Sequence, residues 1–377
     1  MQETPNNSAR GTDSSFTRRR FLAAGSASVV GLTAFGGQVA GQVSESPPYT
    51  VTLSGTIQDP LTAGDINNAR RRLKKKFRQK QPTTTIGEFS SPEVGDQYAL
   101  VAYTCVIDSS GLTNQFFGTI KRRSEETESS PSSESSSAER DELVALSDTY
   151  RRAQAEQIST SDVEALAPAG YNTVNNDIGS DLQAENGFTH ISSNKPWGKL
   201  GMYADIWSEP APSEHWVVRQ DIRVVPGVNI SDWNDENQGR IGNSDKSDLR
   251  ALHQWTFPYA KDGTVKSNTP NGPNNGETTV SATIGSGGAQ VGYSYTVPDI
   301  NRDDNSNFSD AKWNWNWNSG NSSTWRIKTG SRARFAHPDQ VSSFHPNLES
   351  HVRFWRSTGI IGTETDDIFS RDSIGLK

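Results

Sequence analysis

Residues 278–297, with the sequence TTVSATIGSGGAQVGYSYTV, carry the clearest structural pattern in the chain. Apolar residues alternate with Ser and Thr from 280 to 284, and with Gly, Ser and Thr from 291 to 296. The side chains of a β-strand point alternately to its two faces, so both runs have the period of a strand. The glycine-rich residues 285–288 between them predict a β-hairpin with one apolar face and one polar face.

Similar runs recur beyond about residue 185, where all ten tryptophans lie. Residues 216–225 and 311–317 are examples, and clusters of Asn, Gly, Asp and Pro separate such runs. Short strands punctuated by turn residues predict a mainly-β domain over residues 185–377, either a sandwich or an elongated twisted sheet.

Residues 42–121 predict a small α+β unit ahead of this domain. Residues 49–55 alternate like a strand, and the apolar runs 98–107 and 116–120 predict a hairpin. Between them we expect a helix with Thr62 as its N-cap. Its buried face is predicted to consist of Ile66, Ala69, Leu73 and Phe77.

The two units are predicted to be joined by a linker and a helix. Residues 122–141 are expected to be a disordered linker, because residues 124–137 contain no hydrophobic side chain whose burial would offset the ordering entropy. Residues 142–184 are predicted as a helical connector with one apolar stripe, formed by Leu143, Leu146, Tyr150 and Ala153.

Bulk composition narrows the class of protein. The 377 residues have a formal net charge of −7, which repels phosphate, so we expect no nucleic-acid partner. The mean hydropathy of −0.71 and the absence of a long apolar run after the N-terminus disfavour a membrane-spanning helix. Cys105 is the single cysteine, so no internal disulfide can form, and its apolar neighbours predict a buried, inert thiol.

Residues 1–41 resemble a twin-arginine signal peptide. Arg18 and Arg19 precede Phe21 and Leu22, an apolar small-residue stretch follows, and residues 39–41 offer a cleavage site. The alternative is a basic N-terminus on an ordinary buried helix. The resemblance implies that a twin-arginine translocase exports the folded chain, which is then secreted and extracellular. With its acidic balance and more arginine than lysine, the chain resembles a secreted protein of a halophilic archaeon.

The other face of the predicted helix after Thr62 is strongly basic. Arg71, Lys74 and Lys75 are candidates for binding an anionic membrane surface or an acidic partner. The alternative is a solvated face whose long side chains cover a narrow apolar stripe. The cations of this face are Arg70, Arg71, Arg72, Lys74, Lys75, Lys76, Arg78 and Lys80.

Trp313, Trp315 and Trp317 alternate with asparagines and therefore share one face of a predicted strand. If exposed, the three indoles would form a platform for sugar rings or a membrane-interface belt. If buried, they would be core residues, and their N–H groups would need acceptors.

Residues 299–307 alternate oxygen-bearing side chains that suit a Ca²⁺ ion. The candidate ligands are Asp299, Asn301, Asp303 and Asn305. The segment lacks the glycine and the terminal glutamate of an EF-hand loop, and a solvated turn explains the same residues. No other cofactor is expected.

The sequence nominates no catalytic residue. There is no nucleophile elbow, phosphate-binding loop or dinucleotide fingerprint. The histidines show no zinc-binding spacing; they are His190, His215, His253, His337, His345 and His351. A site assembled from distant loops would be invisible in sequence, so an extracellular hydrolase stays an alternative.

The general plan of the chain resembles that of large archaeal protein antimicrobials (halocins): a twin-arginine leader, an acidic body, no disulfide and no catalytic motif. The predicted hairpin over 278–297 also resembles, in pattern, the stem hairpins of β-pore-forming toxins, although sandwich hairpins alternate in the same way. We therefore expect a secreted, non-enzymatic antimicrobial protein that acts at the surface or membrane of competing cells. The alternatives are an extracellular module that binds glycans or a partner protein, and the hydrolase.

Overall fold

A computed structural model describes much of the chain between residues 48 and 374. The export motif and the whole of residues 1–41 lie outside the described part. The described residues all belong to one unit, Gln38–Lys377. They are 48–122, 133–156, 174–178, 182–209, 215–231, 233, 238–242, 248–255, 263–270, 274–275, 279–286, 289–296, 300–317, 323–335, 346–357 and 362–374.

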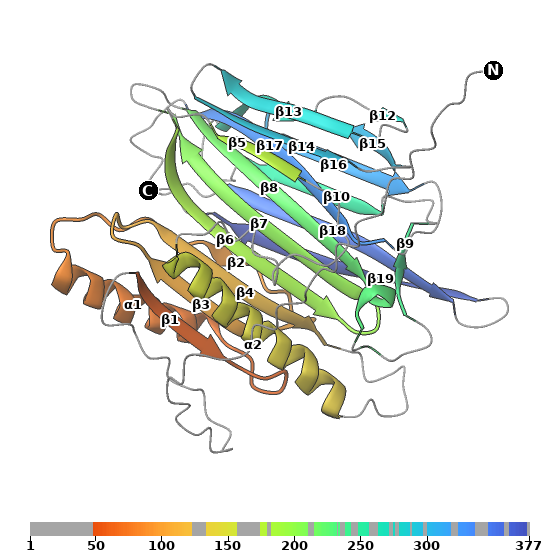
Figure 1. Cartoon of the computed structure of the whole chain (residues 1–377), viewed down its shortest axis with the longest axis horizontal. Helices are drawn as coiled ribbons and strands as arrows, with labels where there is room; N and C mark the ends of the chain where they lie inside the picture. Colours follow the sequence, from red (N-terminus) through yellow and green to blue (C-terminus); the bar gives the residue numbers. More distant parts are fainter. Residues whose placement is uncertain are drawn as a thin grey trace, which may run out of the picture. The chain divides into compact units, whose positions relative to one another are not determined.

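Strands dominate this part of the chain, and eight of them form the sheet that we call sheet A (Figure 1). Neighbouring strands are antiparallel except for one parallel pair, β4 and β6. The spatial order is β1 (Tyr49–Ser54), β3 (Tyr98–Ile107), β4 (Thr113–Lys121), β6 (Gln183–Asn194), β7 (Gly198–Ser208), β8 (His215–Pro226), β17 (Trp325–Phe335) and β11 (Gly263–Thr269).

Two further sheets accompany sheet A. Sheet B follows the order β12 (Asn274–Asn275), β15 (Ile300–Asp304), β16 (Asp310–Trp317), β10 (Leu249–Gln254), β18 (Asn347–Ser357), β19 (Thr363–Ser373) and β2 (Ser91–Pro92), with β9 (Arg240–Ile241) also beside β18. Sheet C has three strands, in the order β13 (Thr279–Ser286), β14 (Ala289–Thr296) and β5 (Val174–Ile178). The expected mainly-β architecture is confirmed.

The main core lies between sheets A and B. Ile222 and Ile327 of sheet A pack in one apolar cluster with Val352 of sheet B. Because side chains alternate along a strand, the other face of sheet A points away from sheet B. This second face, which we call the outer face, is covered over β3 and β4 by helix α2 (Ser133–Ala155).

Helix α1 (Ala63–Lys80) packs on β1 and β3, on the face of sheet A that also meets sheet B (Figure 1). Its first turn is closed by a capping box: the Thr62 side chain accepts from the backbone N–H of Asp65, and the Asp65 side chain accepts from the Thr62 N–H. The predicted cap is confirmed, and so is the predicted apolar face, since all four of its residues are buried. No helix of the described residues is long and apolar enough to cross a membrane.

The sheet order changes the expected division into two units. Strand β4 pairs in parallel with β6 along eight residues, from Thr113 opposite Asn186 to Ile120 opposite Ser193. Strands of the predicted α+β unit and of the predicted β domain therefore belong to one sheet. The Asn186 side chain accepts hydrogen bonds from both the backbone N–H and the hydroxyl of Thr113, at 3.0 and 2.8 Å, which fixes this junction.

Part of the range predicted as a disordered linker is helical. Helix α2 begins at Ser133, inside the range 122–141, and residues 123–132 lie outside the described part. Glu139 explains part of the difference: it is buried and accepts hydrogen bonds from the Ser193 hydroxyl at 2.7 Å and from the Lys195 N–H at 3.1 Å. The partners of Glu139 are 54 and 56 residues away in the sequence, so the local composition of 122–141 could not predict these contacts.

Candidate functional site

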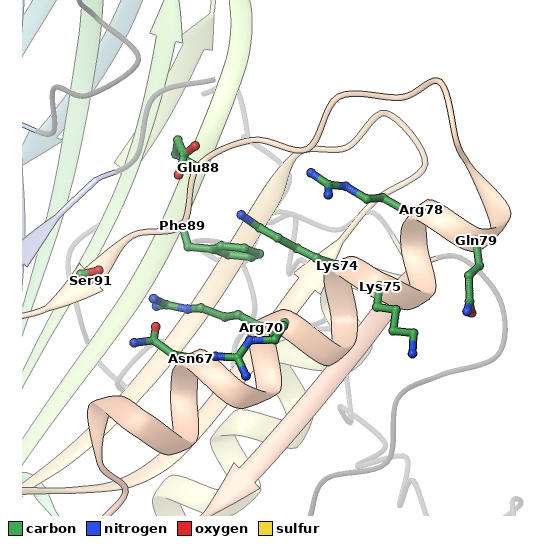
Figure 2. Close-up of a pocket in the computed structure, with 10 residues that line it drawn as sticks. Asn67, Arg70, Lys74, Lys75, Arg78, Gln79, Glu88, Phe89 and Ser91 are labelled. Atoms are coloured by element: carbon green, nitrogen blue, oxygen red, sulfur yellow. The ribbon is translucent and has the colours of Figure 1, made fainter.

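An open groove runs along helix α1. It has a volume of about 820 Å³ and lies between the basic face of α1 and the segment 88–91. Figure 2 shows three cationic side chains reaching from α1 toward that segment: Arg70, Lys74 and Arg78. The predicted candidates Arg71, Lys74 and Lys75 all line the groove, so the structure brings them together.

Arg70 is the innermost cation of the groove. Its Nε donates to the Tyr103 hydroxyl at 3.0 Å, and its Nη2 donates to the Ser90 carbonyl at 2.5 Å and to the Gln115 side-chain oxygen at 2.7 Å. A guanidinium group has five N–H donors. These bonds use three of them, so the two on Nη1 have no acceptor among the described residues.

The burial of Arg70 corrects the sequence prediction. We expected Arg70 on the exposed basic face, but only 9% of its surface is accessible. The reason is its position between α1 and sheet A, where Tyr103 and Gln115 of β3 and β4 supply acceptors. The sequence gives no signal for this, because the acceptors lie 33 and 45 residues away.

Phe89 contacts two of the cations of the groove. The Lys74 ammonium lies 4.6 Å from the centre of its ring, and the Arg70 guanidinium lies 5.3 Å from it. Both distances are within the range of cation–π attraction. The groove is lined by five cations, which are Arg70, Arg71, Lys74, Lys75 and Arg78, and by one carboxylate, that of Glu88. The site is therefore strongly cationic and suited to an anion.

A second candidate site is the hairpin that the sequence pattern predicted. Strands β13 and β14 pair from Thr279 opposite Thr296 to Ser286 opposite Ala289, which confirms the hairpin. β14 also pairs with the short strand β5, and neither belongs to sheet A or sheet B. Val291 of this sheet C is buried. It belongs to a small apolar cluster with Trp207 of β7 and Val217 of β8.

Trp207 and Val217 lie on the outer face of sheet A, so sheet C packs against that face. The same face carries an unusual set of buried charges, because residues 219, 221 and 223 of β8 alternate with the core residues of the strand. Asp221 forms ion pairs with Arg326 at 2.5 Å, Lys328 at 3.7 Å and Arg223 at 3.8 Å. Arg219 pairs with Asp205 at 2.5 Å.

These charges perturb each other strongly. Burial would raise the pKa of Asp221, but the nearby Lys328, Arg223 and Arg326 hold it well below its ordinary value. Burial lowers the pKa of Lys328 to about 7, and the attraction of Asp221 only partly opposes this. Among the described residues that these ion pairs join, there are four cations and two carboxylates. The alternation of charged and apolar residues in 217–224 was a signal for it that our sequence reading did not use.

The tryptophan ladder is core and does not form a surface. Trp313, Trp315 and Trp317 are 0%, 1% and 4% exposed and pack in the cluster between sheets A and B. The indole N–H of Trp313 donates to the Pro270 carbonyl at 2.7 Å, which provides the acceptor that burial requires. The prediction of a surface-binding platform at these residues is thereby corrected: the indole-bearing face of β16 packs against Ile222 and Ile327 of sheet A.

The predicted Ca²⁺ segment forms strand β15 and the turn after it. Asn301 and Asp303 lie within the strand, Asn305 follows it, and Asp299 lies outside the described residues. Alternate residues of an extended strand are roughly 7 Å apart, a spacing that does not wrap a cation. Among the described residues, no group of three or more His, Cys, Asp and Glu side chains could hold a metal ion.

One buried group resembles a hydrolytic triad. His190 Nδ1 lies 2.7 Å from Asp372 Oδ2, and its Nε2 lies 3.4 Å from the Ser192 hydroxyl. All three residues are buried between sheets A and B, so a substrate has no access to the hydroxyl. The Ser192 hydroxyl also bonds to that of Ser370, which shows that the group joins the two sheets.

No protein-family model matches the sequence, and no curated protein matches it. Three solved structures resemble part of the chain. A pore-forming protein shares 11% identity over 53% of this chain and 90% of its own, with a TM-score of 0.29. The delta-toxin of Clostridium perfringens shares 11% identity over 54% and 100%, with a TM-score of 0.30. The Clostridium perfringens NetB toxin in its membrane-inserted form shares 9% identity over 53% and 96%, with a TM-score of 0.26. At these TM-scores the similarity does not establish a shared fold.

Proposed function

We propose that the protein is a secreted antimicrobial that acts on the membranes of competing cells, and that hairpin β13–β14 is the segment that enters the membrane. The observation that supports this proposal is the independence of the hairpin. It pairs with itself and with β5, outside both large sheets, and it packs against β11 and β17 of sheet A, with Val291 in the apolar cluster around Trp207 and Val217. An element attached in this way can leave its resting place without breaking the core between sheets A and B.

The alternating sequence suits the hairpin to a lipid–water boundary. A membrane-spanning strand needs one apolar face toward lipid and one polar face toward a water-filled lumen. Eight residues extend about 26 Å, close to the height of the apolar band of a β-barrel. A lone hairpin would leave unpaired backbone groups in lipid, so several copies must close a barrel. Among the described strands, β13 is an edge strand of sheet C, and after release from sheet A a neighbouring copy could pair with it.

A disulfide between β5 and β14 tests the release of the hairpin. Asn175 lies opposite Ser294 in the antiparallel pair, where Cα atoms are about 4.5–5.5 Å apart, a distance that a disulfide spans. Only residues 179–182 separate β5 from β6 of sheet A, and the five steps from Ile178 to Gln183 reach at most about 18 Å. The variant Asn175→Cys/Ser294→Cys, when oxidised, therefore keeps the hairpin beside sheet A.

We expect the oxidised variant to lose release of a trapped dye from phosphatidylglycerol-containing vesicles, and a reducing agent to restore it. Asn175→Cys alone is the control, and buried Cys105 does not compete for the disulfide. Dye release by the fully oxidised variant at the wild-type rate would contradict membrane entry by this hairpin. The antimicrobial part of the proposal is tested separately, by adding the protein to lawns of related strains; a broad panel without inhibition would refute it.

A further inference from the structure

We infer that the groove along α1 is a binding site for the phosphate of an anionic lipid headgroup, with Arg70, Lys74 and Arg78 as its ligands. The phosphate chemistry follows from the groove itself, whereas the choice of a lipid as its source rests on the proposed function. Nothing in the pairing of the hairpin requires this groove, so the two proposals can fail independently.

The first argument is that hydrogen bonds fix the orientation of the Arg70 guanidinium. Three of its five donors are fixed by Tyr103, Ser90 and Gln115, which orient the guanidinium plane before any ligand arrives. The two remaining N–H groups are both on Nη1, and Arg70 lines the groove. A preorganised donor loses little conformational entropy when it binds an oxyanion. This is the property that distinguishes a binding site from a flexible basic surface.

The second argument is the spacing of the three cations. Arg70, Lys74 and Arg78 are four residues apart along α1, so they lie on one face at intervals of about 6 Å. Figure 2 shows all three side chains directed toward the segment 88–91. Phe89 lies against the charged ends of Arg70 and Lys74 and holds both in place. A group with several charged oxygens, such as phosphate, can accept from more than one of these donors at once.

The third argument separates a lipid from a nucleic acid. The groove runs along α1, which is 18 residues and therefore about 27 Å long. The whole chain has a net charge of −7, which repels a long polyanion that extends beyond the groove. A single headgroup phosphate needs only the cations of the groove and does not extend along the acidic remainder of the chain. The open shape of the groove also admits a headgroup that stays attached to a membrane.

The test compares two charge-matched double variants on the same helix. Lys74→Gln/Arg78→Gln removes one lysine and one arginine from the groove. Arg72→Gln/Lys80→Gln removes the same charges from exposed positions of α1 that do not line it. Binding is measured by co-sedimentation with phosphatidylcholine vesicles that contain phosphatidylglycerol, and thermal unfolding verifies that each variant is folded.

We expect the groove variant to bind roughly 30-fold more weakly than wild type, because each cation near an anionic surface contributes about a factor of five. We expect the matched control to lose less than a third of that effect, and inorganic phosphate to compete more strongly than acetate at equal ionic strength. Equal losses in the two variants, or no loss in the groove variant, would overturn the site.

Two further outcomes would overturn the lipid assignment. One is tighter binding of inorganic phosphate alone than of vesicles, measured by calorimetry. The other is groove-dependent binding of a single-stranded oligonucleotide that is as tight as vesicle binding. Dye release tells the two proposals apart: vesicle binding that depends on the groove, together with leakage that ignores the β5–β14 disulfide, would refute the hairpin mechanism and leave the headgroup site intact.

Discussion

Arg70 and Arg71 are adjacent arginines on the same helix, yet their environments differ completely. Arg71 is exposed, whereas Arg70 is buried against sheet A and hydrogen-bonded to side chains of β3 and β4. His253 is a similar case at the centre of the molecule. It is buried between the sheets, with Ser331 at 2.8 Å from Nδ1, and Gln220 and Thr329 at 3.0 Å from Nε2. At the scale of residues, polar side chains are placed by partners from distant strands.

His253 makes a prediction about pH. Burial lowers its pKa to about 3, from 6.5 in the unfolded chain. The unfolded state therefore binds more protons between these values, and the free energy of unfolding falls as pH drops below about 6.5. One such group contributes up to about 1.4 kcal/mol per pH unit. We expect the wild type to lose about 2 kcal/mol more than His253→Gln between pH 7.5 and 5, measured by urea unfolding.

Because other titrating groups are common to both proteins, the difference between them isolates His253. The hydrogen-bonding amide of Gln keeps partners for Ser331 and Thr329. Parallel losses in the two proteins over this range would mean that His253 is protonated as easily in the folded state as in the unfolded one.

At the scale of elements, β8 and β17 combine an apolar face toward sheet B with a charged outer face. Lys328 and Arg326 of β17 lie on that outer face with Asp221 of β8, and all three are almost fully buried. Sheet C packs on the same face through Val291. Burial of a charge is costly unless the charge is paired, so the partners of each charged side chain on this face decide its contribution to stability.

Replacement of Lys328 should make the protein more stable. Burial lowers the pKa of Lys328 from 10.5 to about 7, so its charge is disfavoured in the folded state, and Asp221 keeps two arginine partners without it. We expect Lys328→Met to raise the free energy of unfolding at pH 7 by about 1–4 kcal/mol. By contrast, Arg326→Met leaves Asp221 without its closest partner and should cost about 3–5 kcal/mol.

The stabilities of wild type and Lys328→Met should also depend differently on pH, which tests the lowered pKa of Lys328. Between about pH 7 and 10.5 the unfolded chain keeps the Lys328 proton that the folded chain has lost, so wild-type stability rises with pH relative to Lys328→Met. The difference between the two proteins should therefore shrink at about pH 9 in denaturant unfolding. A Lys328→Met protein less stable than wild type at both pH values would show that the lysine is a net stabilising partner of Asp221.

At the scale of the whole molecule, sheet A contains strands from both units that we predicted from the sequence, residues 42–121 and residues 185–377. The parallel pair β4–β6 and the packing of α2 on β3 and β4 tie residues 48–122 to the rest. The two large sheets are joined further by the buried hydrogen bonds around His190. Residues 48–122 therefore share one sheet and one core with the rest of the described residues.

This continuity predicts the result of limited proteolysis. A trypsin cut after Arg122 or Arg123 would break the covalent link between β4 and β6. The two strands would stay hydrogen-bonded to each other in sheet A. We expect the two fragments to elute together in native size-exclusion chromatography and to separate in a denaturing gel. Elution of the N-terminal fragment by itself would contradict the shared sheet and would favour a separable prosegment.

The sequence by itself determined the features that depend on neighbours within one element. The period of two over 280–296 defined the hairpin, the apolar spacing after Thr62 defined α1 and its cap, and the apolar run around Cys105 defined a buried strand. Burial raises the pKa of Cys105 to about 11, in agreement with the inert thiol expected from that run. These features follow from local sterics and from the direction in which successive side chains point.

Only the tertiary structure decided which surfaces meet. The same alternation could expose the indoles of 313–317 or bury them, and the packing of that face of β16 against sheet A buried them. A basic helix face could be uniformly solvated, but contact with β3 and β4 turned one of its arginines inward and formed the groove. The physical reason is that burial and hydrogen bonding depend on groups brought together across tens to hundreds of residues, which no local pattern records.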